Sequence, residues 1–104
     1  MIPALCINSS HKPSAIPLQE WINEGAIYHI KHVFFHPGQG VQGVELQEMR
    51  LTAKSHPYVS YRLDRFAIRQ EDLQKLIELM KLCSELDEVD ILAEIEKANL
   101  QIQE

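Results

Sequence analysis

Residues 21–35, WINEGAIYHIKHVFF, are the stretch that decides the fold of this 104-residue chain. They hold its only Trp, two of its three Phe and two of its five His. Gly25 can take a positive φ angle and so reverse the chain. The β-branched and aromatic residues that follow strongly favour a strand. The stretch therefore predicts a turn followed by the longest strand of the protein, over residues 26–35.

The pattern of this strand also predicts that it bends. Tyr28 and Ile30 begin an apolar face, whereas the opposite face becomes apolar only at Val33. A strand changes its buried face in this way at a β-bulge, or where it curves around a small barrel. Pro and Gly within residues 36–40 predict a turn. Residues 26–51 are therefore expected to form a long hairpin.

The second strand of this hairpin is expected over residues 41–51. Alternation places Val44 and Leu46 inward and leaves Gln42 exposed with the other polar residues. Gly43 indicates a bulge or a close approach of another backbone. Shorter strands are expected at residues 2–7, 58–61 and 65–68.

A helical region is expected after the last strand. Apolar residues recur there at 3.6-residue spacing, and acidic residues in the first turn suit the helix dipole. The stripe of this first helix is Leu73, Leu76, Ile77, Met80 and Cys83. Asp87 is expected to cap a second helix, with a single kinked helix as the alternative. The second helix has two candidate stripes, which are Leu92, Ile95, Asn99 and Ile102, or Ile91, Ile95 and Ala98.

These elements predict an α+β fold, in which a small antiparallel SH3-like β-barrel or strongly bent sheet is followed by one or two C-terminal α-helices. The length is that of one domain. The composition, 45% apolar and 24% charged, is that of an ordinary globular protein. We expect a small barrel over residues 1–69 and an acidic amphipathic helical appendage over residues 70–104. No stretch is apolar for long enough to predict a membrane span.

Charge and cysteine content bear on the location of the protein. Residues 1–69 carry seven Lys or Arg against five Asp or Glu, and residues 70–104 carry three against ten, which gives the net charge of −5. The acids are expected to coat the solvated faces of the helices. Cys6 and Cys83 show no disulfide pattern, and both are expected to be buried free thiols. This favours a reducing, cytoplasmic compartment.

Short motifs within residues 4–68 support a resemblance to known proteins. They are Cys6-Ile7-Asn8, Ile16-Pro17, Trp21-Ile22, Gly25, Tyr28, Gly43-Val44, Leu46, Glu48-Met49, Pro57-Tyr58 and Arg65-Phe66-Ala67. By these residues the chain resembles uncharacterised small-barrel proteins of Bacteroidetes-type bacteria and of their phages and mobile elements. The strand order also resembles an SH3-like barrel at the level of the fold. The resemblance implies an architecture and an origin but no activity, because a fold does not determine a function.

Motifs for catalysis are weak. Zinc needs three or four converging ligands, but His29 and His32 face opposite ways on a regular strand. The serines show no nucleophile motif, and Cys6 can meet one of these histidines only through folding. The spacing Gly38-x-Gly40-x-x-Gly43 joins two strands, whereas a dinucleotide fingerprint needs a following helix. We therefore expect no enzyme activity, no cofactor and no metal.

Residues 58–66, YVSYRLDRF, are the stretch most typical of a binding surface. Interleaved aromatic and Arg side chains stack on bases and contact phosphates in many small barrels. The candidate binding residues are Tyr58, Tyr61, Arg62, Arg65 and Arg50. The alternative is that Tyr58 and Phe66 belong to the core and that Arg65 pairs with Asp64 or the acidic tail. The net negative charge favours this alternative.

The helices predict a different surface. Their leucines exceed a single narrow stripe, which leaves apolar area for a partner. The candidate self-association residues are Leu79, Leu82, Leu86 and Leu100. The sequence thus predicts a non-enzymatic intracellular protein-interaction module, with a homodimer as the favoured assembly and another protein as the alternative partner. A weak nucleic-acid-binding barrel is the second hypothesis, and no membrane partner is expected.

Overall fold

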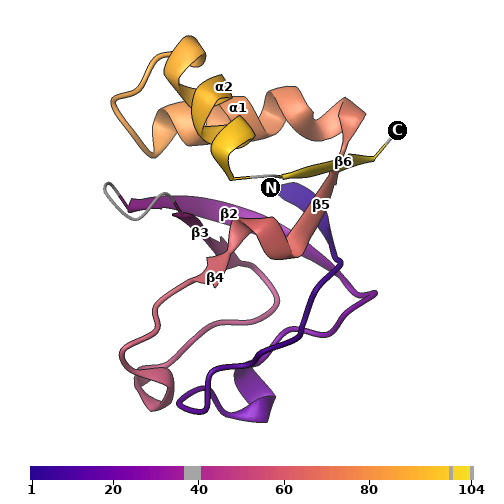
Figure 1. Ribbon diagram of the computed structural model, residues 1–104, viewed down its shortest axis with the longest axis vertical. Coiled ribbons are helices and arrows are strands. Elements are labelled where there is room, and N and C mark those ends of the chain that lie inside the picture. Colours follow the sequence, from indigo (N-terminus) through magenta and orange to yellow (C-terminus); the bar gives the residue numbers. More distant parts are fainter. Residues whose placement is uncertain (37–40, 99, 104) are drawn as a thin grey trace.

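The computed structural model describes residues 1–36, 41–98 and 100–103, which form an α+β fold (Figure 1). Its elements in chain order are β1 (Ile2–Cys6), β2 (Ile27–His36), β3 (Val41–Leu46), β4 (Tyr61–Arg62), β5 (Phe66–Arg69), α1 (Leu73–Leu82), α2 (Glu88–Lys97) and β6 (Gln101–Gln103). Short 3₁₀ turns lie at Leu18–Glu20, Ala53–Ser55, Leu63–Arg65 and Gln70–Asp72. The predicted fold class, a strongly bent sheet followed by helices, is confirmed.

Within the described residues, six strands form one curled sheet with the shape of half a barrel, in the order β4-β3-β2-β1-β5-β6. Neighbouring strands run antiparallel except for β5 and β6, which are parallel. Helices α1 and α2 lie above the sheet, and the loops that join β1 to β2 and β3 to β4 extend below it (Figure 1). The sheet thus separates a helical end of the molecule from a loop end.

Strand β2 bends where the sequence predicts. Its register on β3 shifts between Ile30 and His32, and its buried side chains change from Tyr28 and Ile30 to Val33. Gly25, just before the strand, has a φ of 89°, and its N–H donates to the backbone of β1 at 2.8 Å. The predicted turn and change of buried face are therefore confirmed.

Strand β3 differs from the prediction in its length and in the burial of one side chain. It ends at Leu46 rather than at residue 51, and Gln42, expected in solvent, is buried. The reason is α2, because Gln42 Nε2 donates to a carboxylate oxygen of Glu94 on that helix at 2.6 Å. Gly43 lies between two backbones, paired with β2 on one side and β4 on the other. The predicted turn at residues 37–40 lies outside the described residues.

The helical region consists of two helices that contact each other, so the single kinked helix is wrong. Asp87 is the N-cap of α2, as predicted, and its Oδ1 accepts from Asp90 N at 2.9 Å. Of the two candidate stripes of α2, the one with Ile91 and Ala98 is buried. The predicted stripe of α1 is buried at Leu76, Ile77 and Met80. Within the described residues, neither helix is long and apolar enough to cross a membrane.

The end of the chain departs from the prediction. The rejected stripe of α2 extends to Ile102, but the helix ends at Lys97 and residues 101–103 form β6. Ile102 pairs with Ile68 of β5 in that strand. A strand of three residues is ordered by its partner in the sheet, which helical periodicity in the sequence does not report. Residues 70–104 thus supply the helical layer and also an edge strand.

One hydrophobic core joins the helices to the sheet. Its largest fully buried side chains come from strands, loops and both helices, and they are Phe66, Ile16, Ile22, Ile30, Leu46, Leu63, Ile68, Leu76, Met80, Ile91, Val33 and Val44. Burying each such side chain stabilises the fold by about 1.5–3 kcal/mol. Residues 1–69 and 70–104 differ in their main type of element, but they share this core.

Candidate functional site

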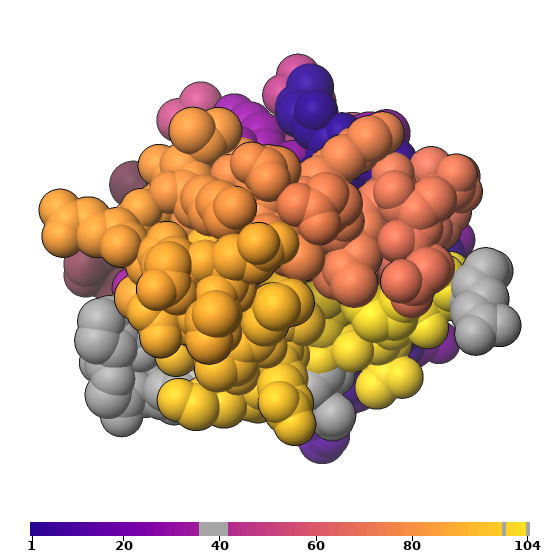
Figure 2. Space-filling model, turned by 90° about the horizontal axis from the view of Figure 1, so that it is seen from above, coloured from indigo at the N-terminus to yellow at the C-terminus, as the bar shows by residue number. Residues whose placement is uncertain are grey.

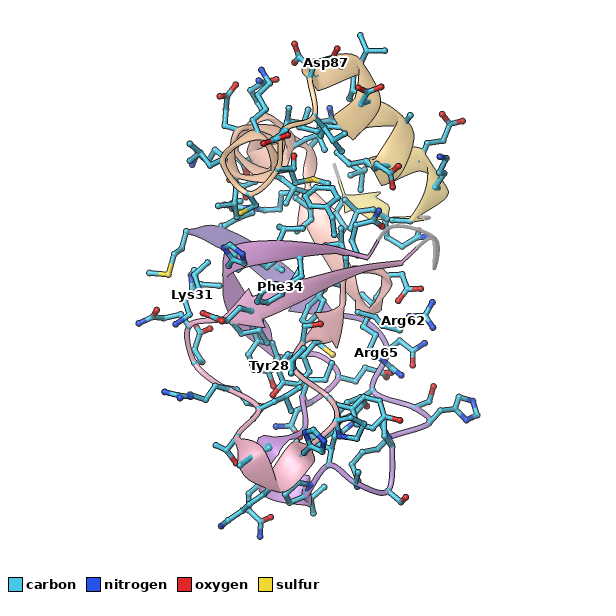
Figure 3. All side chains as sticks on the ribbon, turned by 90° about the vertical axis from the view of Figure 1, so that its left-hand side faces the viewer. Tyr28, Lys31, Phe34, Arg62, Arg65 and Asp87 are labelled. Carbon is cyan, nitrogen blue, oxygen red and sulfur yellow. The ribbon has the colours of Figure 1, made fainter. Side chains whose placement is uncertain are left out.

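The candidate binding residues of the sequence do not form one surface. Arg62 and Arg65 extend on the same side of the molecule (Figure 3) and line the same pocket, whereas Arg50 lines a different pocket of about 280 Å³. Tyr61 is buried, and Tyr58 is exposed. The structure therefore divides the five residues: Arg62 and Arg65 line one pocket, Arg50 and the buried Tyr61 line the other, and Tyr58 lines neither.

The pocket shared by the two arginines, called the arginine pocket below, has a volume of about 650 Å³. It lies where the loop after β1 meets the turn before β5 and the start of β6. Its polar lining residues are Asn8, Ser10, His11, Arg62, Asp64, Arg65 and Gln101. Because these segments are distant in the sequence, no short sequence motif indicates the pocket.

The position of Arg65 follows from the packing of its neighbours. The 3₁₀ turn Leu63–Arg65 precedes β5, and both Leu63 and Phe66 are fully buried, which leaves Arg65 directed toward the loop after β1. Its guanidinium carbon lies 4.9 Å from the centre of the Trp21 ring, within the range of a cation–π contact. Burial lowers the pKa of Arg65, although a guanidinium keeps its charge in proteins.

The hydrogen bonds of Arg65 differ from those expected. Its Nη1 donates to the backbone oxygens of Asn8 and Ser10 at 3.2 and 2.8 Å. Asp64, one of the predicted partners, pairs instead with Arg62 at 2.7 Å. Arg65 forms no ion pair with any residue that the structure describes. It is thus a fixed cation bonded to neutral groups.

Tyr61 is a structural residue. It is buried beside Trp21, with the two ring centres 6.1 Å apart, and its hydroxyl donates to the backbone oxygen of Glu20 at 2.6 Å. Burial, followed by the charge of Glu20, raises the pKa of Tyr61. The ring is therefore not available for stacking on a ligand.

Glu20 is the polar anchor of the loop end, and sequence reasoning missed it. Its carboxylate accepts from Thr52 N at 2.6 Å, from Thr52 Oγ1 at 2.8 Å and from Ser55 Oγ at 2.9 Å. The bond from Thr52 N, then that from the Thr52 hydroxyl, lowers the pKa of Glu20. Glu20 and Thr52 lie 32 positions apart, so nothing in the local pattern indicates their contact.

The structure separates the four leucines predicted for self-association. Only Leu82 lies on the surface, with 85% of its area exposed. The other three are half-buried and pack against the core, and they are Leu79, Leu86 and Leu100. Sequence reasoning missed Val89, and it placed Leu92 on a candidate core stripe. Both are exposed, at 75% and 47%, and their spacing of three residues puts them on one face of α2.

Leu82, Val89 and Leu92, called the hairpin surface below, lie on helices that are side by side across the helical end (Figure 2). Carboxylates of α2 and of the loop before it are exposed on the same end of the molecule. Several of these form no ion pair with any described residue, and they are Glu85, Asp87, Glu88, Asp90 and Glu96. Their charges are available to a partner.

The histidines and cysteines provide no metal site, since no group of three or more ligands converges in the described part of the chain. His29 donates from its backbone N to Glu48 at 2.7 Å, and its ring contacts the same carboxylate. His32 Nδ1 lies 3.4 Å from Sγ of Cys83, which is half-buried rather than buried. The Cys–His contact considered for Cys6 forms with the other cysteine. Burial raises the pKa of the Cys6 thiol, which makes it less reactive.

No protein-family model, curated protein or solved structure matches this chain. The resemblance of residues 4–68 to small-barrel proteins of bacteria and phages therefore stays a prediction. The arginine pocket and the hairpin surface are the two features of the structure that bear on its function.

Proposed function

We propose that this protein is a non-enzymatic protein-interaction module, and that its hairpin surface binds a basic, amphipathic segment of another protein. The observation that carries the proposal is the exposure of Leu82, Val89 and Leu92 among carboxylates that have no ion-pair partner in the described residues. This surface lies on two helices, α1 and α2, that the hydrophobic core holds against the sheet.

The hairpin surface carries more apolar side chains than α2 needs to pack on the sheet. A helix that packs on its own sheet needs one apolar stripe, and α2 has that stripe at Ile91 and Ala98. Val89 and Leu92 form a second apolar face, which points away from the core. Clustered apolar side chains on a surface are typical of sites that bind another protein.

Charge argues against the homodimer that the sequence favours and for the alternative, another protein. A dimer through this surface would bring the carboxylates of two copies together, such as Glu85 and Glu88 of each chain, and like charges across an interface oppose association. A basic segment would instead neutralise them. Charge complementarity therefore favours a basic partner over a second copy, which remains the competing occupant.

Nucleic-acid binding is the second proposal, and the structure supports it less. Proteins that bind single strands stack bases on exposed aromatic side chains, but Tyr61 is buried, and the exposed Tyr58 does not line the pocket of Arg62 and Arg65. Arg50 lies apart from Arg62 and Arg65, and the net charge of −5 repels phosphates. Titration of labelled single- and double-stranded oligonucleotides at low salt tests this proposal, and the absence of binding there eliminates it.

The experiment for the main proposal uses a fluorescent amphipathic helical peptide made of Leu and Lys. We expect the full chain to raise the fluorescence anisotropy of this peptide saturably, and the affinity to fall as salt rises, because salt screens the attraction. The double variant Val89→Ser/Leu92→Ser should bind at least about tenfold more weakly, the loss typical of truncating central interface contacts. Val59→Ser removes an exposed apolar side chain of the loop end and is the matched control.

Equal binding by the double variant and the parent protein contradicts the proposal, as does equal binding of a peptide in which Glu replaces Lys. Sedimentation velocity of the same proteins tests the competing occupant. A dimer that the double variant dissociates assigns the hairpin surface to self-association instead.

A further inference from the structure

The arginine pocket carries positive charge that its own acid does not neutralise. Two guanidinium groups line it, but Asp64 is its only carboxylate, and Asp64 pairs with Arg62. Arg65 is half-buried and bonded to two neutral carbonyl oxygens. A partly desolvated cation is unfavourable when the only nearby carboxylate, Asp64, is paired with another arginine, and an anion in the pocket would relieve this cost.

The pocket is also organised before any ligand arrives. Arg65 is held by the loop after β1 and by its contact with Trp21, and the indole N–H of Trp21 donates to the Ser9 oxygen of the same loop at 2.8 Å. A side chain that is already ordered loses little entropy when it binds a ligand. Such order is an advantage for a binding site and is unusual for a surface arginine, whose side chain is normally free to rotate.

We propose that the arginine pocket binds the phosphate group of a small phosphorylated molecule. Arg65 is the fixed contact, and the exposed Arg62 supplies a second guanidinium in exchange for its surface pair with Asp64. Guanidinium groups bind phosphate oxygens through pairs of parallel hydrogen bonds. The side chains of His11 and Gln101 line the same space and can contact the rest of the ligand. The volume of about 650 Å³ lies within the range of small-molecule sites, roughly 300–1,000 Å³.

The aromatic residues around the pocket favour a small molecule over a nucleic acid. Trp21 is almost fully buried, and Arg65 lies over its ring. Tyr61 is buried as well. A base of a bound strand would therefore find no open aromatic surface in the pocket on which to stack, because the exposed Tyr58 does not line it.

The experiment uses the emission of Trp21, which is the only tryptophan in the chain and lies against Arg65. The full chain is titrated with inorganic phosphate and separately with ribose 5-phosphate, at constant ionic strength. We expect a saturable change in emission with each ligand, and tighter binding of the sugar phosphate. Arg62→Gln should weaken both about tenfold, the loss of one charge-assisted hydrogen bond. Arg50→Gln removes an arginine from the other pocket and should leave both affinities unchanged.

Arg65→Lys is the second variant, because it keeps the charge but loses the planar fork, and it should weaken binding more than Arg62→Gln does. The proposal is wrong if the parent protein shows no saturable change, or if Arg62→Gln and Arg65→Lys both bind like the parent. Tight binding of an oligonucleotide that increases with its length, in place of binding to the sugar phosphate, identifies a nucleic acid as the occupant and overturns the proposal.

Discussion

Glu20 and Arg65 at the loop end of the molecule have fixed hydrogen-bond partners, whereas several carboxylates at the helical end have no ion-pair partner among the described residues. Glu20 accepts three hydrogen bonds from one loop, and Arg65 is bonded to another. Glu85, Glu88 and Glu96 form no ion pair in the described residues, and the helices are held by buried apolar side chains. Glu20 and Arg65 thus hold the loop end together, whereas the helical end leaves several carboxylates for a partner.

The largest expected effect tests whether apolar burial holds the helical end. Ile91→Ala removes a fully buried side chain that joins α2 to the core, and it should lower the free energy of unfolding by about 2–5 kcal/mol. Leu92→Ala, at the next position but exposed, should change it by no more than about 0.5 kcal/mol. Urea denaturation of the two variants measures both values. Similar losses for the two would mean that α2 is packed differently.

The second prediction concerns the fixed arginine of the loop end. Arg65→Ala removes two hydrogen bonds from a charged donor and the contact with Trp21, and it should cost about 1.5–3 kcal/mol. Arg62→Ala removes only an exposed ion pair and should cost at most about 1 kcal/mol. Urea denaturation followed by Trp21 emission gives both values. A larger loss for Arg62→Ala would reverse the roles assigned to the two arginines.

The third prediction is a dependence of stability on pH at the loop end. The folded-state pKa of Glu20 is lowered from 4.5 by its bonds with Thr52, so its contribution is complete above that value and is lost as the pH falls through the folded pKa. Glu20→Gln should therefore be less stable than the parent at pH 7, and the two should converge in acid. Thermal unfolding between pH 7 and pH 3 measures this, with the exposed Glu24→Gln as the control that should follow the parent. Parallel curves for Glu20→Gln and the parent would contradict the assigned role.

The smallest effect is expected where a carboxylate has no partner. Glu96 lies in the last turn of α2, where the negative end of the helix dipole opposes an acid. Glu96→Gln should therefore leave stability unchanged or raise it by about 0.3 kcal/mol. The same variant should weaken the binding of the Leu/Lys peptide. A clear loss of stability would show that Glu96 has a structural role and would remove the contrast between the two ends.

Sequence reasoning succeeded where the physical cause is local. The positive φ of Gly25, the shift of register after Ile30 and the cap at Asp87 each depend on a few neighbouring residues. The buried stripe of α1 follows from helical periodicity alone. Where a residue is covered by a distant element, the same reasoning failed. Gln42 was placed in solvent because an isolated strand contains no information about the helix above it.

The sequence by itself determined the class of the fold, the bent strand, the presence of a C-terminal helical region and its acidic character. Only the tertiary structure decided which charged and apolar residues are accessible. It brought Arg65 to Asn8 across 57 positions, bonded Glu20 to Thr52, and packed three of the four candidate leucines half-buried against the core while it exposed Val89. The physical reason is the distance along the sequence over which each interaction acts. Backbone propensity and periodicity act within a few residues, whereas burial and ion pairing depend on which segments the whole chain packs together.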